Sequence, residues 1–341
     1  MNPLELNFQD RSGATARTAQ NAAVSSTSPQ FVRVDAEDDG QRIDNFLLRV
    51  LKGVPRSHLY RVMRRGEVRV NKGRVKASHR LHAGDLVRIP PLRLPSPETP
   101  ARAPDTQLAR LNRSILYEDD RLLVIDKPSG LAVHGGSGLS YGLIESLRQL
   151  RSGHELELVH RLDRETSGCL IISKRRSALR ELHKLIREGG MDKRYLALLV
   201  GDLAETETMV AAPLKKNVLQ SGERLVRVDP VDGKPARTLL RRLRRFQLDD
   251  QRLTLVEARL ITGRTHQIRV HAAHLGTPLA GDPKYGDELA NRALRSSGLS
   301  RLFLHACALT VRLDNMTQPL RVEASLPHEL EQLLSRLESR E

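Results

Sequence analysis

The sequence predicts an α+β protein in two parts, a small helix–helix–hairpin module and a larger domain on a large, mostly antiparallel mixed sheet with flanking helices. Three observations predict this class. Strand-type apolar segments outnumber helical ones after residue 113 and do not alternate with them, which argues against a doubly wound parallel sheet. Six prolines within residues 90–104 mark a domain boundary. A length of 341 residues suits two domains of ordinary size.

The chain begins with a tail and two short helices. Residues 1–30 show no apolar periodicity, so we expect them to be disordered. Residues 43–51 carry apolar side chains at spacings of three and four, which predicts a helix with one buried face. A second helix is predicted over residues 57–65, and Gly66 ends it.

A β-hairpin follows the two helices. Residues 67–70 alternate between polar and apolar side chains, and the segment Asn71-Lys72-Gly73 supplies a tight turn. A last strand is predicted over residues 85–89. The whole module is expected to span residues 31–92.

The positive charge of the chain is concentrated in this module. The protein has a net charge of +15, and residues 41–93 hold fourteen basic and three acidic side chains, a net +11. An arginine-rich composition explains the preference for Arg over Lys but not the local shortage of acids. A compact basic patch is typical of proteins that bind nucleic acids. The candidate contacts lie on the second helix and the hairpin: Arg56, Arg61, Arg64, Arg65, Arg69, Lys72 and Arg74.

The segments RVMRRGEVRVNKGRV and AGDLVRIP resemble the S4 RNA-binding domain over residues 41–90. The resemblance implies structured RNA as the partner, and not DNA. Composition alone does not make that distinction.

Residues 93–110 are predicted to form a Pro-rich linker, and residues 111–341 the larger domain. Its elements follow from continuous apolar runs for strands and three-and-four spacing for helices. Strands are predicted at residues 114–117, 122–125, 169–172, 195–200, 254–261, 267–270 and 302–311, and helices at residues 143–150, 177–188 and 330–337.

Several classes of protein are unsupported by the sequence. His266, His271 and His274 have no carboxylate or thiolate in register, so no metal site is expected. The Gly-rich residues 135–138 lack both phosphate-loop and dinucleotide-binding spacings, so no nucleotide cofactor is expected either.

The same holds for membrane and secreted proteins. No apolar run is long enough to span a bilayer, and residues 1–30 have no apolar signal region. The two cysteines are far apart and form no CxxC pair, which favours a reducing compartment. We therefore expect a cytoplasmic protein without membrane contact, and a monomer.

Polar, Gly-bounded segments next to apolar strands are the candidates for chemistry: residues 126–130, 160–168, 193–195 and 263–271. In the second of these, Asp163 lies near Arg161 and Arg164 just before a buried strand. Nearby guanidinium groups favour the charged carboxylate, which can act as a nucleophile or general base. The alternative is a surface loop of salt bridges.

The fourth segment alternates over residues 267–270, which predicts a strand with Gln267 and Arg269 on one face. Arg269 would then suit a bidentate pair with Asp163. The alternatives are an ordinary phosphate contact or an exposed arginine.

The segment HRLDRETSG closely resembles the signature of the RluA family of RNA pseudouridine synthases, and DKPSGLAVH, KRYLALL and GRTHQIRVH resemble its accompanying motifs in the same order. With the S4 module, the similarity covers residues 41 to about 330. It implies Asp163, Tyr195 and Arg269 as catalytic residues, with Tyr195 against the uracil and Arg269, or else Arg264, as the basic partner of the aspartate. The predicted RNA contacts on the catalytic loops are Arg161, Arg164 and Arg264.

The segments LKGVPRSHLYRVMRRGEVRVNKGR and VHGGSG further resemble the members that act on the large ribosomal subunit, which implies 23S rRNA as substrate. Isomerising uridine to pseudouridine requires no cofactor, but the base must be flipped out of its stack. Asp163 could attack C1′ or C6, or remove the C2′ proton, and the sequence does not separate these routes. The other hypothesis, a non-catalytic S4-type RNA chaperone or ribosome-assembly factor, predicts a broken catalytic loop, whereas residues 160–168 are intact.

Overall fold

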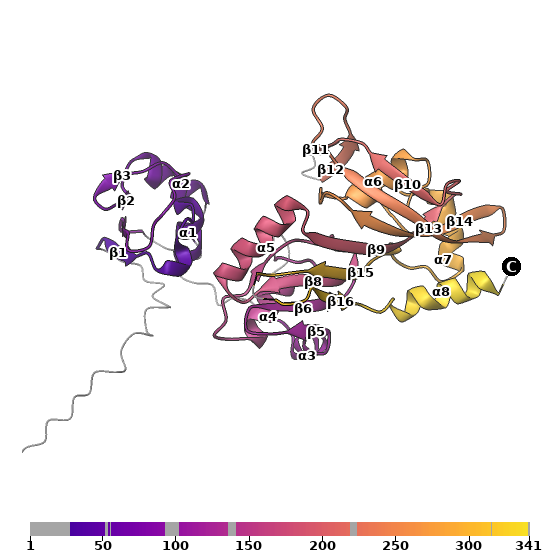
Figure 1. Cartoon of the computed structure of the whole chain (residues 1–341), viewed down its shortest axis with the longest axis horizontal. Coiled ribbons are helices and arrows are strands. Elements are labelled where there is room, and N and C mark those ends of the chain that lie inside the picture. Colours follow the sequence, from indigo (N-terminus) through magenta and orange to yellow (C-terminus); the bar gives the residue numbers. More distant parts are fainter. Residues whose placement is uncertain are drawn as a thin grey trace, which may run out of the picture. The chain divides into compact units, whose positions relative to one another are not determined.

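The computed structural model describes residues 28–51, 54, 56–92, 102–135, 141–218, 224–314 and 316–339. The chain divides into two compact units, Met1–Pro100 and Ala101–Glu341 (Figure 1). Residues 1–27 of the predicted tail and part of the predicted linker lie outside the described residues.

The first unit packs two helices on a four-stranded antiparallel sheet of order β1-β4-β2-β3. Its elements are β1 (Gln30–Arg33), the 3-10 helix η1 (Ala36–Asp38), α1 (Ile43–Val50), α2 (Arg56–Arg64), β2 (Arg69–Val70), β3 (Gly73–Arg74) and β4 (Leu86–Ile89). Ile43, Phe46 and Leu47 are fully buried against strand residues such as Val87. The predicted helices and hairpin are confirmed, and β1 is an additional edge strand.

The hairpin turn shows why the sequence has Asn-Lys-Gly at this place. Asn71 and Lys72 have φ angles of 47° and 72°, the left-handed region that two-residue hairpin turns require. The Asn71 side chain accepts a hydrogen bond from the Leu86 amide at 2.9 Å and donates one to Asp85 at 2.8 Å. The turn is therefore tied to β4, and the basic hairpin is held in one register.

The second unit is built on a ten-stranded sheet of order β10-β13-β14-β9-β15-β8-β6-β5, with β16 beside β15 and β7 beside β8. Among the described strands, the β15–β8 pairing is parallel and the others are antiparallel. The strands are β5 (Ile115–Glu118), β6 (Leu122–Lys127), β7 (Glu157–Leu158), β8 (Ser167–Ser173), β9 (Met191–Val200), β10 (Glu207–Ala211), β13 (Arg237–Leu248), β14 (Gln251–Leu260), β15 (Leu304–Val311) and β16 (Leu320–Glu323). The predicted large, mostly antiparallel mixed sheet is confirmed.

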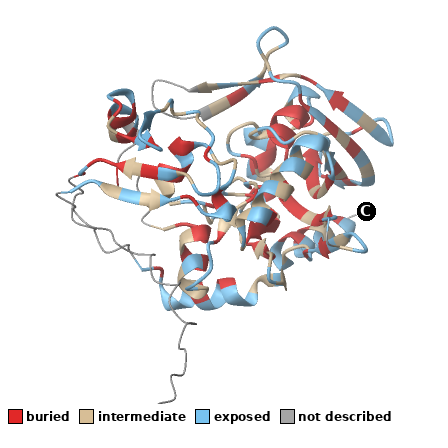
Figure 2. Ribbon diagram, turned by 60° about the vertical axis from the view of Figure 1, so that its left-hand side comes forward, coloured by how far each residue is buried: buried red, intermediate tan, exposed pale blue. Residues whose placement is uncertain are grey.

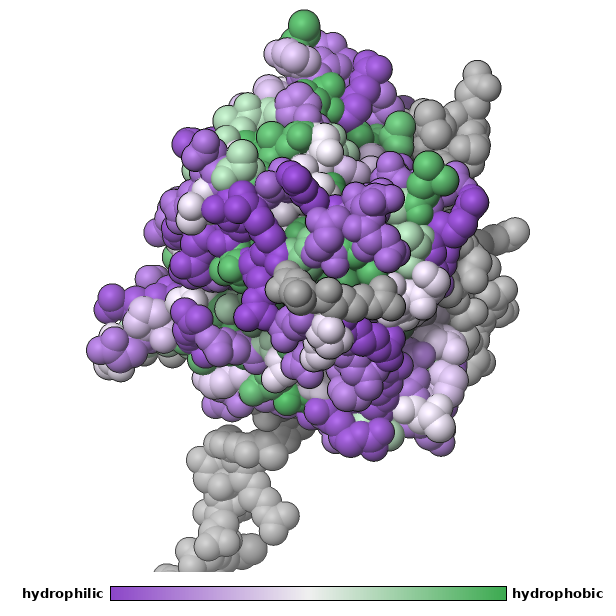
Figure 3. Space-filling view, turned by 90° about the vertical axis from the view of Figure 1, so that its right-hand side faces the viewer, coloured by the Kyte–Doolittle hydropathy of each residue, from purple (hydrophilic) through white to green (hydrophobic). Residues whose placement is uncertain are grey.

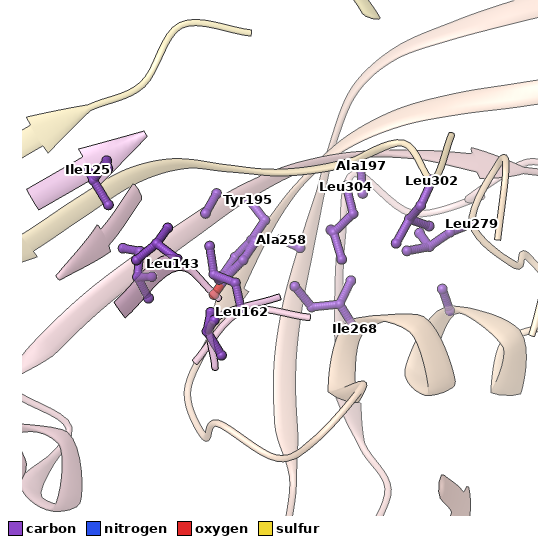
Figure 4. Close-up of a cluster of buried hydrophobic side chains, with 14 of the residues drawn as sticks. Ile125, Leu143, Leu162, Tyr195, Ala197, Ala258, Ile268, Leu279, Leu302 and Leu304 are labelled. Atoms are coloured by element: carbon purple, nitrogen blue, oxygen red, sulfur yellow. The ribbon is translucent and has the colours of Figure 1, made fainter. Parts of the chain in front are cut away.

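Helices cover both faces of this sheet. The helices are α3 (Asp105–Arg113), α4 (Leu143–Leu150), α5 (Arg176–Glu188), α6 (Gln267–His274), α7 (Glu288–Ser296) and α8 (His328–Glu338). Side chains of α3, α4 and α6 share one apolar cluster with alternate residues of β6, β8 and β9 (Figure 4). On the other face, α5 packs over β6 and β8, while α7 and α8 pack over β9, β13 and β14. Figure 2 shows the buried residues concentrated on the central strands and on the helix faces turned toward them.

The second unit differs from the prediction in several features, and β7, β16 and α7 are among the elements that were not predicted. Residues 267–270 form the first turn of helix α6 and not a strand. Helix α3 begins at Asp105, within the residues predicted as linker. The strands β10 and β13 and the separate two-stranded sheet of β11 (Leu214–Val218) and β12 (Arg224–Val228) were not predicted, because β13 carries five arginines and lacks an apolar run.

A glycine is required where the parallel strands β8 and β15 meet. Gly168 pairs with Ala306 and has a φ angle of 107°, a conformation that other residues rarely adopt. A Cβ atom at this position would lie 2.3 Å from the Ala306 carbonyl oxygen. Gly168 therefore allows β8 to begin directly after the loop that contains Asp163.

The face of the molecule shown in Figure 3 is mostly hydrophilic, with small separate apolar patches. Within the described part of the chain, no helix is both long and apolar enough to cross a bilayer.

Candidate active site

Asp163 lies in the loop between β7 and β8, just before the first residue of the buried strand β8. The preceding residue, Leu162, is buried in the main apolar cluster, and the Thr166 amide donates to the Asp163 carbonyl oxygen at 3.2 Å. The Asp163 side chain is 17% exposed. The burial of Leu162 and the Thr166 hydrogen bond thus fix the backbone on both sides of Asp163, while its carboxylate stays partly exposed.

A buried lysine at the end of β6 holds the backbone of this loop by a hydrogen bond. The Lys127 ammonium donates to the carbonyl oxygens of Pro128, Leu131 and Arg164 at 2.9, 2.9 and 3.0 Å. Burial lowers the pKa of Lys127 to about 7, since the charged form is costly in an apolar surrounding. Together with the Ser129 hydroxyl, which donates to the Glu165 carbonyl at 2.7 Å, it connects the β6 end to the Asp163 loop.

Two side chains of the α6 start flank the Asp163 carboxylate. Arg269 Nη1 lies 3.4 Å from Asp163 Oδ2, and His266 Nε2 lies 3.7 Å from Asp163 Oδ1. Each carboxylate oxygen therefore has its own basic neighbour. The structure brings Asp163 and Arg269 together as predicted, although Arg269 comes from a helix.

The bidentate pair of Arg269 is formed with Asp282 and not with Asp163, which corrects the prediction. Arg269 Nε and Nη2 donate to the two Asp282 oxygens, each at 2.7 Å. Burial opposes the charge on Arg269, but the Asp282 hydrogen bonds and negative charge outweigh it, so its pKa lies above the usual value. Asp282 neutralises Arg269, and Asp163 receives a weaker single contact.

Arg264, the other candidate for the basic partner, points elsewhere. Its Nε donates to the Pro235 carbonyl oxygen at 3.1 Å, and the residue is exposed. Of the two arginines that the sequence leaves open, the structure places Arg269 beside the carboxylate.

Asp163 lies at a cavity of about 620 Å³. Its walls come from the Asp163 loop, the end of α5, β9, and the segment from β14 to α6. Tyr195 lines the cavity and is 6% exposed, and burial raises the pKa of its hydroxyl. Figure 4 shows Tyr195 beside Leu162 and Ala258. The ring is thus a rigid aromatic wall of the cavity.

The cavity lining is strongly basic. Among the described residues that line it, Asp163 is the one acidic side chain, and the Lys and Arg residues are Arg161, Arg187, Lys193, Arg264 and Arg269. Burial lowers the pKa of Lys193. Such a lining is suited to a ligand that carries phosphate groups.

The remaining predicted contacts are exposed. Arg161 lies at the cavity, and Arg164 Nε donates to the Gly130 carbonyl oxygen at 2.9 Å. In the first unit the side chains of the following residues are exposed: Arg61, Arg64, Arg65, Arg69, Lys72 and Arg74. The Arg56 side chain lies outside the described residues.

Three residues of the site were not identified from the sequence: His266, Asp282 and Tyr285. Tyr285 lies under Arg269, with the guanidinium carbon 5.0 Å from the ring centre, and its hydroxyl is 2.8 Å from His266 Nδ1. The segment Gly281-Asp282-Pro283 is a turn signal that could have directed attention to this place.

Comparisons with known proteins agree with this arrangement. Residues 121–274 match the family described as RNA pseudouridylate synthase, and residues 41–87 match the S4 domain. The ribosomal large subunit pseudouridine synthase C of Escherichia coli (strain K12) is 52% identical over 316 residues, 91% of this chain and 97% of that protein. The protein of that name from Yersinia pestis is 51% identical over 89% of this chain and 94% of its own length.

Solved structures show the same relationship. Human RNA pseudouridylate synthase domain containing 4 is 28% identical and superimposes with a TM-score of 0.56, covering 69% of this chain and 96% of that one. The human domain containing 1 is 26% identical with a TM-score of 0.51, covering 66% and 94%. The catalytic loop, its cavity and these similarities lead to one conclusion: the chain belongs to the RluA family of RNA pseudouridine synthases and carries an S4 domain.

Proposed function

We propose that this enzyme isomerises specific uridines of 23S rRNA to pseudouridine, with Asp163 as the catalytic carboxylate. The observation that carries the proposal is the position of Asp163 at the cavity, between Arg269 and His266, in a chain that is 52% identical to a ribosomal large subunit pseudouridine synthase. We further propose that it acts as a monomer in the cytoplasm, on RNA rather than DNA and without a membrane or a cofactor.

The cavity suits a nucleotide that has been flipped out of the RNA. Its volume of about 620 Å³ is within the ordinary range for small-molecule sites. An enzyme that works on a base has to extrude it from the stack, and a fixed aromatic surface offsets part of the lost stacking. Tyr195 provides that surface on the cavity wall, and the basic lining is placed to receive the flanking phosphates.

Asp163 then acts on the sugar or the base, while Arg269 and His266 orient its two oxygens. The glycosidic bond between N1 and C1′ breaks, the uracil turns, and C5 bonds to C1′. The hydrogen on C5 leaves as a proton and the freed N1 gains one, so the product is an isomer of the substrate. The balance of this reaction requires no oxidant, reductant or group donor.

The S4 unit is proposed to contribute affinity for the RNA backbone. Replacing Arg61, Arg64 and Arg65 together by Ala is expected to weaken 23S rRNA binding and to flatten its salt dependence by about two units of the log–log slope, because each lost phosphate contact removes roughly 0.7–0.9. Binding measured from low to moderate salt tests this. Arg292→Ala, an exposed side chain of α7, is the control, and an unchanged slope in the triple variant would contradict the proposal.

The overall function is tested by mapping pseudouridines in 23S rRNA from a strain that lacks this gene, with and without complementation. Specific pseudouridines are expected to disappear in the deletion strain and return with the intact gene. If every pseudouridine persists while ribosome assembly is impaired, the protein acts as a non-catalytic RNA chaperone, and the proposal is wrong.

A further inference from the structure

The two basic neighbours of Asp163 are held by a single turn of the chain. Asp282 Oδ1 accepts hydrogen bonds from the Lys284 and Tyr285 amides at 2.8 and 3.1 Å, which closes the turn. The same carboxylate holds Arg269 by two bonds of 2.7 Å, and Tyr285 lies against both Arg269 and His266. Arg269 and His266, on either side of Asp163, are thus held in position by Asp282 and Tyr285, which are three positions apart.

The turn itself is rigidly fixed. The buried Asn291 side chain of α7 donates to the Asp282 carbonyl at 2.9 Å and accepts from the Gly281 amide at 2.7 Å. A Cβ atom at Gly286 would lie 2.2 Å from the Asp282 carbonyl oxygen. Helix α7 therefore holds the backbone of the turn in one position.

The hydrogen bonds of Tyr285 determine which nitrogen of His266 carries the proton. The Val226 amide of β12 donates to the Tyr285 oxygen at 3.0 Å. The hydroxyl hydrogen has His266 Nδ1, 2.8 Å away, as its acceptor, and leaving a part-buried hydroxyl hydrogen unpaired would cost free energy. Burial lowers the pKa of His266, which favours the neutral ring, and in that ring an accepting Nδ1 leaves the hydrogen on Nε2.

His266 Nε2 then points its hydrogen toward Asp163 Oδ1, 3.7 Å away. This separation exceeds a hydrogen bond, and such contacts commonly tighten when substrate binds. His266 is the residue before the first turn of α6, and its backbone has a φ angle of 51°, in the left-handed region. A strained residue at this point is consistent with a role in the site.

We propose that the turn Asp282–Tyr285 is a positioning element of the active site, in which Tyr285 acts through His266 to orient the Asp163 carboxylate. The inference rests on the proposed function, because it concerns the geometry of the same carboxylate. Tyr285 and His266 are positioning residues: they act on Asp163 and not on the uridine.

The test is the pair of variants Tyr285→Phe and His266→Asn. The first removes only the hydroxyl and keeps the ring under Arg269. Asn tolerates the left-handed conformation and can still bond to Tyr285, but its amide is too short to reach Asp163. Each variant is expected to lower kcat by roughly 10–100-fold, the scale of a misplaced catalytic group, with KM for 23S rRNA changed by less than about threefold. Purely structural damage would not produce this split.

A double variant shows whether Tyr285 acts through His266. If it does, Tyr285→Phe with His266→Asn loses no more kcat than about twice the loss of the more damaged single variant, since the two residues form one path. Losses that multiply would overturn the inference. If Tyr285→Phe does not fold, an unchanged kcat in His266→Asn overturns the inference, because Tyr285 then has no path to Asp163.

Tyr117→Phe is the matched control. Its hydroxyl also donates to a neighbour, Asp119 Oδ2 at 2.9 Å, but Tyr117 does not line the cavity, so its kcat should stay unchanged. Activity in the wild type, its loss in Asp163→Asn and full kcat in Tyr285→Phe would refute this inference alone. An inactive wild type would refute the proposed function instead.

Discussion

Replacing Asp163 by Asn is expected to abolish pseudouridine formation while leaving RNA affinity nearly unchanged. The side chain keeps its size and its place between Arg269 and His266, but an amide can neither attack carbon nor accept a proton as a carboxylate does. Losing a catalytic group of this kind lowers turnover by roughly 10³-fold or more. Tritium release from RNA labelled at C5 of uridine measures it, because that hydrogen leaves in the reaction.

The control for this variant is Asp202→Asn. Asp202 pairs with Arg245 at 2.7 Å and lies outside the cavity, so turnover should remain at the wild-type level. RNA binding by all three proteins should agree within about threefold, since a single small side chain contributes little to a large polyanion interface. Turnover in purified Asp163→Asn within tenfold of wild type would show that another group performs the reaction.

The position of the Asp163 loop beside a buried strand could be predicted because it depends on local sequence. Asp163 lies in a polar loop that runs into the fully buried strand β8, and Tyr195 begins the apolar run of the buried strand β9. Continuous apolar runs and alternation are visible within ten residues. The two helices and the hairpin of the S4 unit were predictable for the same reason, since each closes its own local hydrogen bonds.

Helix α6 could not be predicted in the same way. Six consecutive residues from Gln267 to Ala272 are buried, so the helix has no polar face and no amphipathic period. The alternation of polar and apolar letters then resembles a strand. Tertiary packing decides here: the polar Gln267 donates to the Arg237 carbonyl and to Thr238, and His271 bonds to Thr238, all within the core.

The partners of Arg269 were hidden for a different reason. Asp282 is thirteen positions away along the chain, and its pairing depends on how the turn before α7 lies against α6. No periodicity links two such residues. The sequence analysis paired Arg269 with Asp163 because Asp163 was the one candidate carboxylate it had identified. In the fold, the bidentate partner of Arg269 is the buried Asp282, which holds the arginine in place.

Because Asp282 holds the buried Arg269, removing its carboxylate should lower the free energy of unfolding more than the other substitutions considered above. In Asp282→Ala, the buried Arg269 would keep the 3.4 Å contact with Asp163 as its one carboxylate partner, and we expect the free energy of unfolding to fall by about 3 kcal/mol. Denaturant unfolding measures it. The control is Glu288→Ala, because Glu288 and Arg292 form an exposed pair 3.5 Å apart, for which a change below about 0.5 kcal/mol is expected.

The loss in Asp282→Ala should also depend on pH. Burial raises the pKa of Asp282, but the hydrogen bonds and charge of Arg269 outweigh it and hold the pKa below its usual value. Such a carboxyl stabilises the fold fully above its unfolded pKa, about 3.9, and this contribution disappears as pH falls through the lower folded value. The stability difference between wild type and variant should hence be constant near neutral pH and shrink below about pH 4. A difference that persists unchanged into acid would mean that Asp282 stabilises the fold by packing, and that Arg269 does not depend on its charge.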